Sequence, residues 1–580
     1  MNSISGQLYR PIAQWTGQLI LPSLAQRHSD GGVYLTLENT PEPYRHLKGQ
    51  TVWLNWHSNS IHQTWINRAV TDIHFDETTR QSMENFSIHP TRLEGWSNVS
   101  PLESLAGARP DDDIQVELDV QTVEQVGNTW IVSIGDEPLQ IVGVQKALVQ
   151  FVASAGDKRY RVRHYNPQTR NFDGKEETIA LPDAGFQQPG HQVEQSSIID
   201  LETSPLNAEG WYIYGTHNPE GLFIVGAIEP AAALSLAPTR MLSGREETRQ
   251  HFVETKWEQI PLHRMERTLV DNNGGILYGN QRSPDLMQKR QRELWYKGDM
   301  GLVVHTFGWR GGERGDRAIL GLVPGHFAFG FAQVIADEFT GNLRFDLVYR
   351  QVYGHNREGV VAGAHRWHSY MGSFKRGWMY TLPVSDVVIR IPELTIPYQL
   401  GDRRFDPLQT ILQELAFMET RYRTGPGNGA SVVTPATSCV KDSSQSLFAA
   451  IQRLKTEVIS DRTVKQWVEN HPTDFEVQRF KRLELLLEQV EKSMLIPLGY
   501  VPQNWRGENQ EVAAHRRGAS FNASTILEGL KAWKTMLPRR AEMELMRVLM
   551  QYGGTMFDYQ SAMIGGKISG LVPNPPTVIL

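Results

Sequence analysis

The sequence has few of the groups from which several common kinds of site are built. It contains one cysteine, Cys439, among 580 residues, which excludes an internal disulfide framework and any zinc or iron–sulfur site made from several cysteines. No apolar run approaches the roughly 18 residues that a membrane-spanning helix requires. The first residues lack the basic segment and apolar core of a signal peptide. These absences predict a cytoplasmic protein without integral membrane insertion.

Motifs for nucleotides and nucleic acids are also missing. The formal net charge is −6, which gives no indication of a basic nucleic-acid surface. Glycine-rich segments occur at 308–315 and 424–430, but neither has the order of a phosphate-binding loop. No G-x-S-x-G elbow is present, which disfavours an α/β-hydrolase. We therefore expect no nucleic-acid partner and no cofactor.

What the chain does contain predicts a multidomain α+β fold, because 580 residues exceed one ordinary core. Short segments rich in β-branched and aromatic residues fill the first 270 positions or so, which is typical of antiparallel barrels or sandwiches. Amphipathic periodicity dominates the C-terminal part. The expected units are an N-terminal β region at 1–178, a second β unit with a connector at 179–280, an α+β domain at 281–458 and a helical region with a tail at 459–580.

Local signals predict individual elements. Ser283 followed by Pro284 is a good helix start, which predicts a helix over 283–296. Helical periodicity also covers 407–423 and 473–495. Strands at 325–335 and 342–353 flank a short polar turn and are predicted to form a hairpin, and a second hairpin is predicted within 210–228.

The single cysteine occupies a position that favours reactivity. The segment before Cys439 is extended, and the segment after it has helical spacing, so the thiol is expected at a helix N-terminus. Ser438 and Thr437 precede it, and both are cap-forming residues whose hydroxyls are candidates to help the helix-start amides hold an oxyanion. Helix-terminal amides and the helix dipole favour a thiolate, which predicts a lowered thiol pKa and a place for an oxyanion. The alternative is a small buried side chain without a role.

A nucleophilic thiol needs a base, and His326 is the strongest candidate. It opens a strand directly after Pro324 and Gly325. Pairing within the predicted hairpin places it opposite a position near 351, so Gln351 or His355 is expected to hold the imidazole in the required tautomer.

The chain order of these residues resembles that of a known superfamily. The segment "GHFAFGF" (325–331) and the segment "TSCVKDSSQSLF" (437–448) are similar to the histidine strand and the cysteine helix of the circularly permuted papain-like superfamily, which includes lecithin:retinol acyltransferase-like proteins and related amidases. The resemblance covers residues 300–455. It implies a thiol hydrolase or acyltransferase acting on a peptide, amide or ester, with Cys439 as nucleophile, His326 as base and Gln351 or His355 as orienter.

The chain as a whole is similar to large cyanobacterial proteins labelled as predicted Abi or CAAX-type proteases, through segments 103–113, 393–410 and 427–443. That label implies a membrane metalloprotease with a Glu-x-x-x-Arg motif, which Glu419 and Arg423 match in spacing. Without membrane helices that mechanism does not apply, and an i,i+4 pair of this kind is typical of a salt bridge.

Other readings stay open. Arg310 and Arg314 lie in a glycine-rich loop that is suited to an acidic substrate. Zinc ligation by His355, His365 and His368 would make the protein a metallohydrolase. A third reading is a non-catalytic scaffold whose N-terminal β region binds a protein partner.

Overall fold

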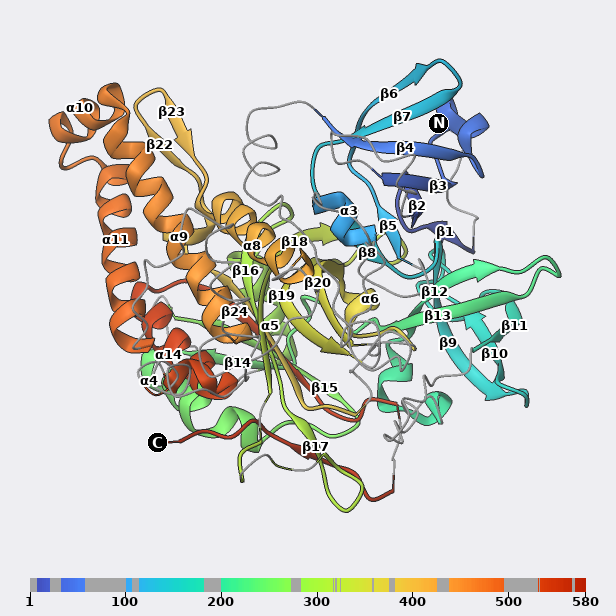
Figure 1. Cartoon of the computed structure of the whole chain (residues 1–580). Helices are drawn as coiled ribbons and strands as arrows, with labels where there is room; N and C mark the ends of the chain where they lie inside the picture. The colour runs from blue at the N-terminus through green and yellow to red at the C-terminus, as the bar shows by residue number, and fades with distance from the viewer. Residues whose placement is uncertain are drawn as a thin grey trace.

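The fold is given by a computed structural model of the chain. It describes residues 8–20, 33–57, 101–106, 114–181, 200–272, 283–316, 318, 321–323, 325–356, 359–374, 381–424, 438–494, 530, 533–565 and 569–579. The architecture is mixed α and β, with large β-sheets covered by helices, in agreement with the expected α+β class (Figure 1).

The largest sheet has 15 strands and is mainly antiparallel. Its central strands are long and apolar, and β16 and β21 are buried along almost their whole length. In spatial order the sheet contains β14 (Arg240–Ser243), β15 (Met265–Asp271), β24 (Thr555–Ser561), β21 (Val384–Arg390), β16 (Met300–Phe307), β18 (His326–Ala336), β19 (Leu343–Asn356), β20 (Gly359–Arg366), β8 (Leu139–Ile141), β5 (Gln115–Glu117), β2 (Thr16–Ile20), β3 (Val33–Asn39), β4 (Thr51–Trp56), β7 (Thr129–Ile134) and β6 (Val120–Val126).

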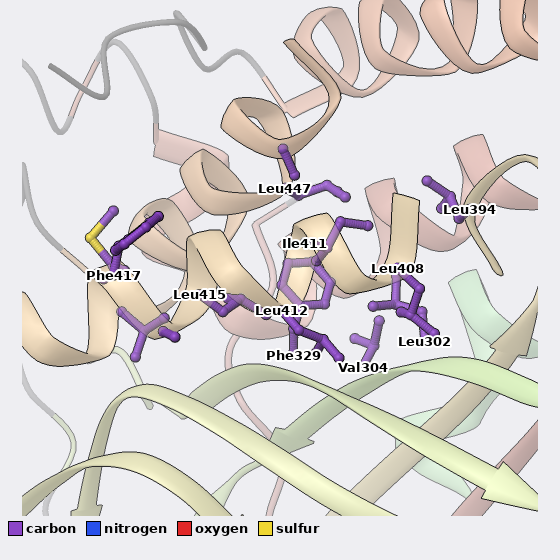
Figure 2. Packing of buried hydrophobic residues seen from close by; sticks show 14 of the residues in the cluster. Leu302, Val304, Phe329, Leu394, Leu408, Ile411, Leu412, Leu415, Phe417 and Leu447 are labelled. Carbon is purple, nitrogen blue, oxygen red and sulfur yellow. The ribbon is translucent and has the colours of Figure 1, made fainter. Parts of the chain in front are cut away.

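Helices cover one face of the central strands (Figure 1). Leu302, Val304 and Phe329 of the sheet face apolar side chains of the covering helices, as Figure 2 shows. Burial of these side chains removes apolar surface from water, which is the main force holding the layers together. The helices of this region are α7 (Pro392–Thr395), α8 (Pro407–Thr424), α9 (Cys439–Ser460), α10 (Arg462–Asn470), α11 (Phe475–Met494) and α14 (Pro538–Leu549).

A second sheet closes into a small barrel, because β9 pairs with both β10 and β12. The parallel pair β11–β13 completes the ring, so the barrel is mixed rather than purely antiparallel. The barrel contains strands from both sides of the expected boundary at 178. Its strands are β9 (Gln145–Ser154), β10 (Arg159–His164), β11 (Glu176–Ala180), β12 (Trp211–His217) and β13 (Phe223–Pro230), with β1 (Arg10–Pro11) added at β9.

The C-terminal part is not purely helical. Strand β24 lies between β15 and β21 and is buried at every position. A short strand, β25 (Val572–Asn574), pairs with β17 (Trp309–Gly311). Part of the region expected to be a separate helical unit therefore completes the central sheet, because an all-buried strand needs neighbours on both edges.

Several local predictions are confirmed. Helix α5 (Pro284–Leu294) begins at Ser283, whose side chain accepts a hydrogen bond from the Leu286 amide. The hairpin β12–β13 and the hairpin β18–β19 both form. Among the described residues, no helix combines the length and apolar character that a bilayer crossing needs.

Candidate functional site

Cys439 is the first residue of α9, as the cap signals predicted. Ser438 is the N-cap: its hydroxyl oxygen accepts from the Lys441 amide at 3.0 Å, and its proton goes to the carbonyl oxygen of Thr535 at 3.1 Å. The Ser438 side chain is therefore occupied in fixing the helix start. Thr437 lies outside the described residues.

His326 is the first residue of β18 and is 3% exposed. Its Nε2 lies 2.7 Å from Oε1 of Gln351 on β19. The two strands pair with Ile335 opposite Arg344, two positions from the expected register. A bulge in the β19–β20 pairing follows Gln351, and bulges of this kind re-aim nearby side chains.

The start of α9 and the start of β18 meet at the cysteine. The backbone amides of Phe327, next to His326, of Val440 and of Cys439 itself lie near the Cys439 sulfur, where they favour its thiolate form. The ladder between β18 and β19 begins only at Phe329. One strand end and one helix end thus supply three N–H groups to a single buried sulfur.

Burial has a larger effect on the thiol than the expected helix-terminal field. It raises the pKa of Cys439 to about 11, although the amides of Phe327, Val440 and Cys439 act in the opposite direction. The expected lowering of the thiol pKa is therefore wrong. Because the thiol is protonated at neutral pH, any attack by sulfur requires a base that removes the proton as the new bond forms.

Gln351 fixes the tautomer of His326. An amide oxygen only accepts, so the 2.7 Å contact places the proton on His326 Nε2 and makes Nδ1 the nitrogen without a proton when the ring is neutral. The other end of the same amide, Nε2 of Gln351, faces the hydroxyl of Tyr370. This orientation is the one that a base for a neighbouring thiol requires.

A layer of buried polar side chains lies beside this pair and was missed from the sequence. His305 Nδ1 is 2.7 Å from Oδ1 of Asp386, and the Tyr349 hydroxyl donates to Oδ2 of the same carboxylate at 2.8 Å. The ring of Tyr370 lies 5.4 Å from that of His305 and 6.4 Å from that of His326, between centroids. The available signal was a polar residue, His305, inside an otherwise apolar strand.

The remaining predicted residues do not all join this cluster. Arg310 binds the carboxylate of Asp316, with Nη2 at 2.7 Å from Oδ1, and Arg314 is exposed. Both follow Phe307, which pairs with His326, so their loop leaves the sheet at the edge where the site lies. The side chain of His355 lies outside the described residues.

The other two histidines, His365 and His368, do not support the zinc-site alternative. His368 stacks on the Tyr214 ring at 3.9 Å, and its Nε2 accepts from the Val142 amide at 3.3 Å. His365 lies on β20, and its ring centroid is 6.0 Å from that of Tyr370. Over the described part of the chain, no group of three or more His, Cys, Asp or Glu residues is arranged to hold a metal ion.

Glu419 and Arg423 belong to a buried ion network rather than to an open site. Arg350 Nη1 lies 3.1 Å from Oε2 of Glu419 and 3.0 Å from Oε2 of Glu137, and Arg423 Nη2 lies 2.5 Å from Oε1 of Glu137. The network joins α8 to β19 and to the loop before β8. It holds together the N-terminal and central parts of the large sheet.

This network predicts a pH-dependent stability. Burial raises the pKa of Glu419 to about 8 from its ordinary 4.5, against the opposing field of Arg350. Between pH 4.5 and about pH 8, the folded protein therefore keeps a proton on Glu419 that the unfolded chain has lost. The contribution of Glu419 to the free energy of unfolding is fully present below the pKa of the unfolded chain. It is lost as pH rises toward the pKa of the folded protein, by up to about 1.4 kcal/mol per pH unit.

The expected observation is a melting temperature that falls between about pH 5 and about pH 8, with a shallower fall in Glu419→Gln. Glu469→Gln, at an exposed position, is the matched control and should keep the wild-type slope. Identical slopes in wild type and Glu419→Gln would show that this carboxyl does not titrate there.

Comparison with known proteins gives no independent guide to function: no protein-family model matches the chain, and no curated protein or solved structure is significantly similar to it.

Proposed function

We propose that the protein is a thiol-dependent hydrolase or acyltransferase that acts on an amide or ester, with peptides among the candidate substrates. The observation that carries the proposal is the meeting of the Cys439 helix start with the strand that begins at His326, which is held by Gln351. Cys439 is the nucleophile, His326 the base and Gln351 the residue that orients it. Residues 281–458 would then contain a papain-like domain.

The chemistry follows from the protonation states. His326 Nδ1 removes the thiol proton while sulfur attacks the carbonyl carbon, which gives a tetrahedral oxyanion. Collapse of that intermediate breaks the bond to the leaving group, which takes the proton from His326 Nδ1, and leaves a thioester on Cys439. Water, or another acceptor activated by His326, then attacks the thioester and returns the free thiol.

Because the natural substrate is not identified, an activated ester is the appropriate probe. With p-nitrophenyl acetate we expect a burst of p-nitrophenol with an amplitude equal to the protein concentration, followed by slower turnover. The burst should be absent in Cys439→Ala, whose fold is checked by circular dichroism. A burst of equal size in Cys439→Ala, or no burst in the wild type, would overturn the proposal.

A further inference from the structure

The hydroxyl of Tyr370 is a buried polar group that is faced by the donor Nε2 of Gln351, so its own proton has no acceptor there. Tyr370 is the last residue of α6 (Trp367–Tyr370) and is 3% exposed. Within the described residues, its oxygen has no hydrogen-bond partner of normal geometry. A buried hydroxyl in this state is destabilising relative to a paired one. Such a cost is retained where the group serves a ligand or a reaction.

The Tyr370 side chain lies beside the cysteine site. The Tyr370 ring packs edge-on against His305 and Tyr349, with centroids 5.4 Å and 5.2 Å away. Burial, with the neighbouring Cys439 sulfur and Asp386 carboxylate, holds the pKa of Tyr370 well above its ordinary value. The phenol therefore keeps its proton at neutral pH and stays able to donate it in a hydrogen bond.

Other donors near the sulfur have defined tasks in the resting protein. The amides of Phe327, Val440 and Cys439 lie near the sulfur and favour its thiolate form, and the Ser438 hydroxyl bonds to Thr535. His326 Nε2 donates to Gln351. The Tyr370 O–H remains as a side-chain donor that is not committed elsewhere in the described structure.

We infer that Tyr370 is a further catalytic residue, whose hydroxyl donates a hydrogen bond to the oxyanion that forms when Cys439 attacks a carbonyl. This inference rests on the proposed function. The Tyr370 proton stays on its oxygen throughout: the Cys439 proton goes to His326, the carbonyl π electrons go to the oxyanion, and their return breaks the bond to the leaving group. A donor of this kind lowers the barrier because the negative charge exists only in the transition state and intermediate.

Asp386 acts on the Tyr370 hydroxyl indirectly, through His305 and Tyr349. The carboxylate accepts from both Tyr349 and His305, which fixes two of the rings against which Tyr370 packs. His305, Tyr349 and Asp386 are therefore positioning residues for the phenol, because they act on it through packing and hydrogen bonds to one another.

Two reactions of the same sulfur separate this role from a structural one. Alkylation by iodoacetamide forms no oxyanion, whereas acylation by p-nitrophenyl acetate does. In Tyr370→Phe we expect acylation of Cys439 to slow by about 10²–10³-fold, as for the loss of one oxyanion donor, while the alkylation rate is unchanged. The urea midpoint should stay equal or rise, because the hydroxyl that is removed has no partner. Tyr296→Phe, at a residue 55% exposed, is the matched control and should change neither rate.

The outcomes are distinct. If the wild type is not acylated at Cys439, the proposed function fails and the role of Tyr370 fails with it. If the wild type is acylated and Tyr370→Phe is acylated at the same rate, only the role of Tyr370 is overturned. A parallel loss of alkylation, acylation and stability would identify Tyr370 as a packing residue and would also overturn the inference.

Discussion

Replacing His326 with glutamine should slow the proposed acylation of Cys439 by about 10²–10⁴-fold, the usual contribution of a positioned general base. The reason lies in the thiol: its pKa is raised to about 11 by burial, so almost none of it is thiolate at neutral pH, and attack depends on removal of the proton. Glutamine has a similar size and keeps polar atoms in the site but does not accept a proton. The measurement is the rate constant of the p-nitrophenol burst.

The control for this variant is His471→Gln, which changes an exposed histidine at the end of α10 in the same way. It should leave the burst unchanged. Gln351→Ala should give an intermediate loss, since it frees the ring without removing the base. A burst in His326→Gln that is as fast as in the wild type would show that another group removes the thiol proton.

The largest expected effect on stability is at Lys256, which is 1% exposed. Its Nζ contacts the carboxylate of Glu542 and lies 3.1 Å from Oδ1 of Asp558. Burial lowers the pKa of Lys256, but the charges of Asp558 and Glu542 outweigh this and raise it above its ordinary value. The ammonium therefore neutralises two buried carboxylates that join β24 to α14.

Lys256→Met keeps much of the side-chain volume but leaves both carboxylates without their cation. Breaking a buried pair in this way costs about 3–5 kcal/mol, which urea unfolding followed by tryptophan fluorescence should detect as a large fall in the midpoint. Lys465→Met, whose lysine is 53% exposed and 4.0 Å from Glu469, should stay within about 0.5 kcal/mol of the wild type. Equal midpoints for the two variants would show that the Lys256 cluster does not hold the sheet to the helix.

Local chemistry made much of the site predictable. The cap at Ser438 and the helical spacing after it located the start of α9, and the strand opening at His326 was equally clear. Gln351 was one of two candidates, beside His355, because a hairpin with a short turn limits the register to a few choices; the observed register differs by two positions. These features depend on residues close in the sequence, which is why sequence patterns carry them.

Long-range assembly was less predictable. The insertion of β24 between β15 and β21 pairs residues separated by more than 150 positions, and no local pattern specifies that partner. The thiol pKa was misjudged for a related reason. The helix dipole can be read from the sequence, but the depth of burial that opposes it depends on the whole fold.

Tyr370 and His305 were missed because each looks ordinary in its own segment. Their significance comes from convergence of β16, β18, β19 and α6 on one buried layer. A polar side chain in an apolar strand is a useful signal only when the partner on the next strand is known. Here that partner is Asp386, which lies opposite His305.

The most direct test of the account is to locate the acyl group after brief reaction with p-nitrophenyl acetate, by peptide mapping and mass spectrometry. We predict one acetyl group on Cys439 in the wild type, which appears far more slowly in His326→Gln and never at this position in Cys439→Ala. Acetylation spread over surface lysines with Cys439 unmodified would contradict the account, because it would show that the buried thiol and His326 do not work together as nucleophile and base.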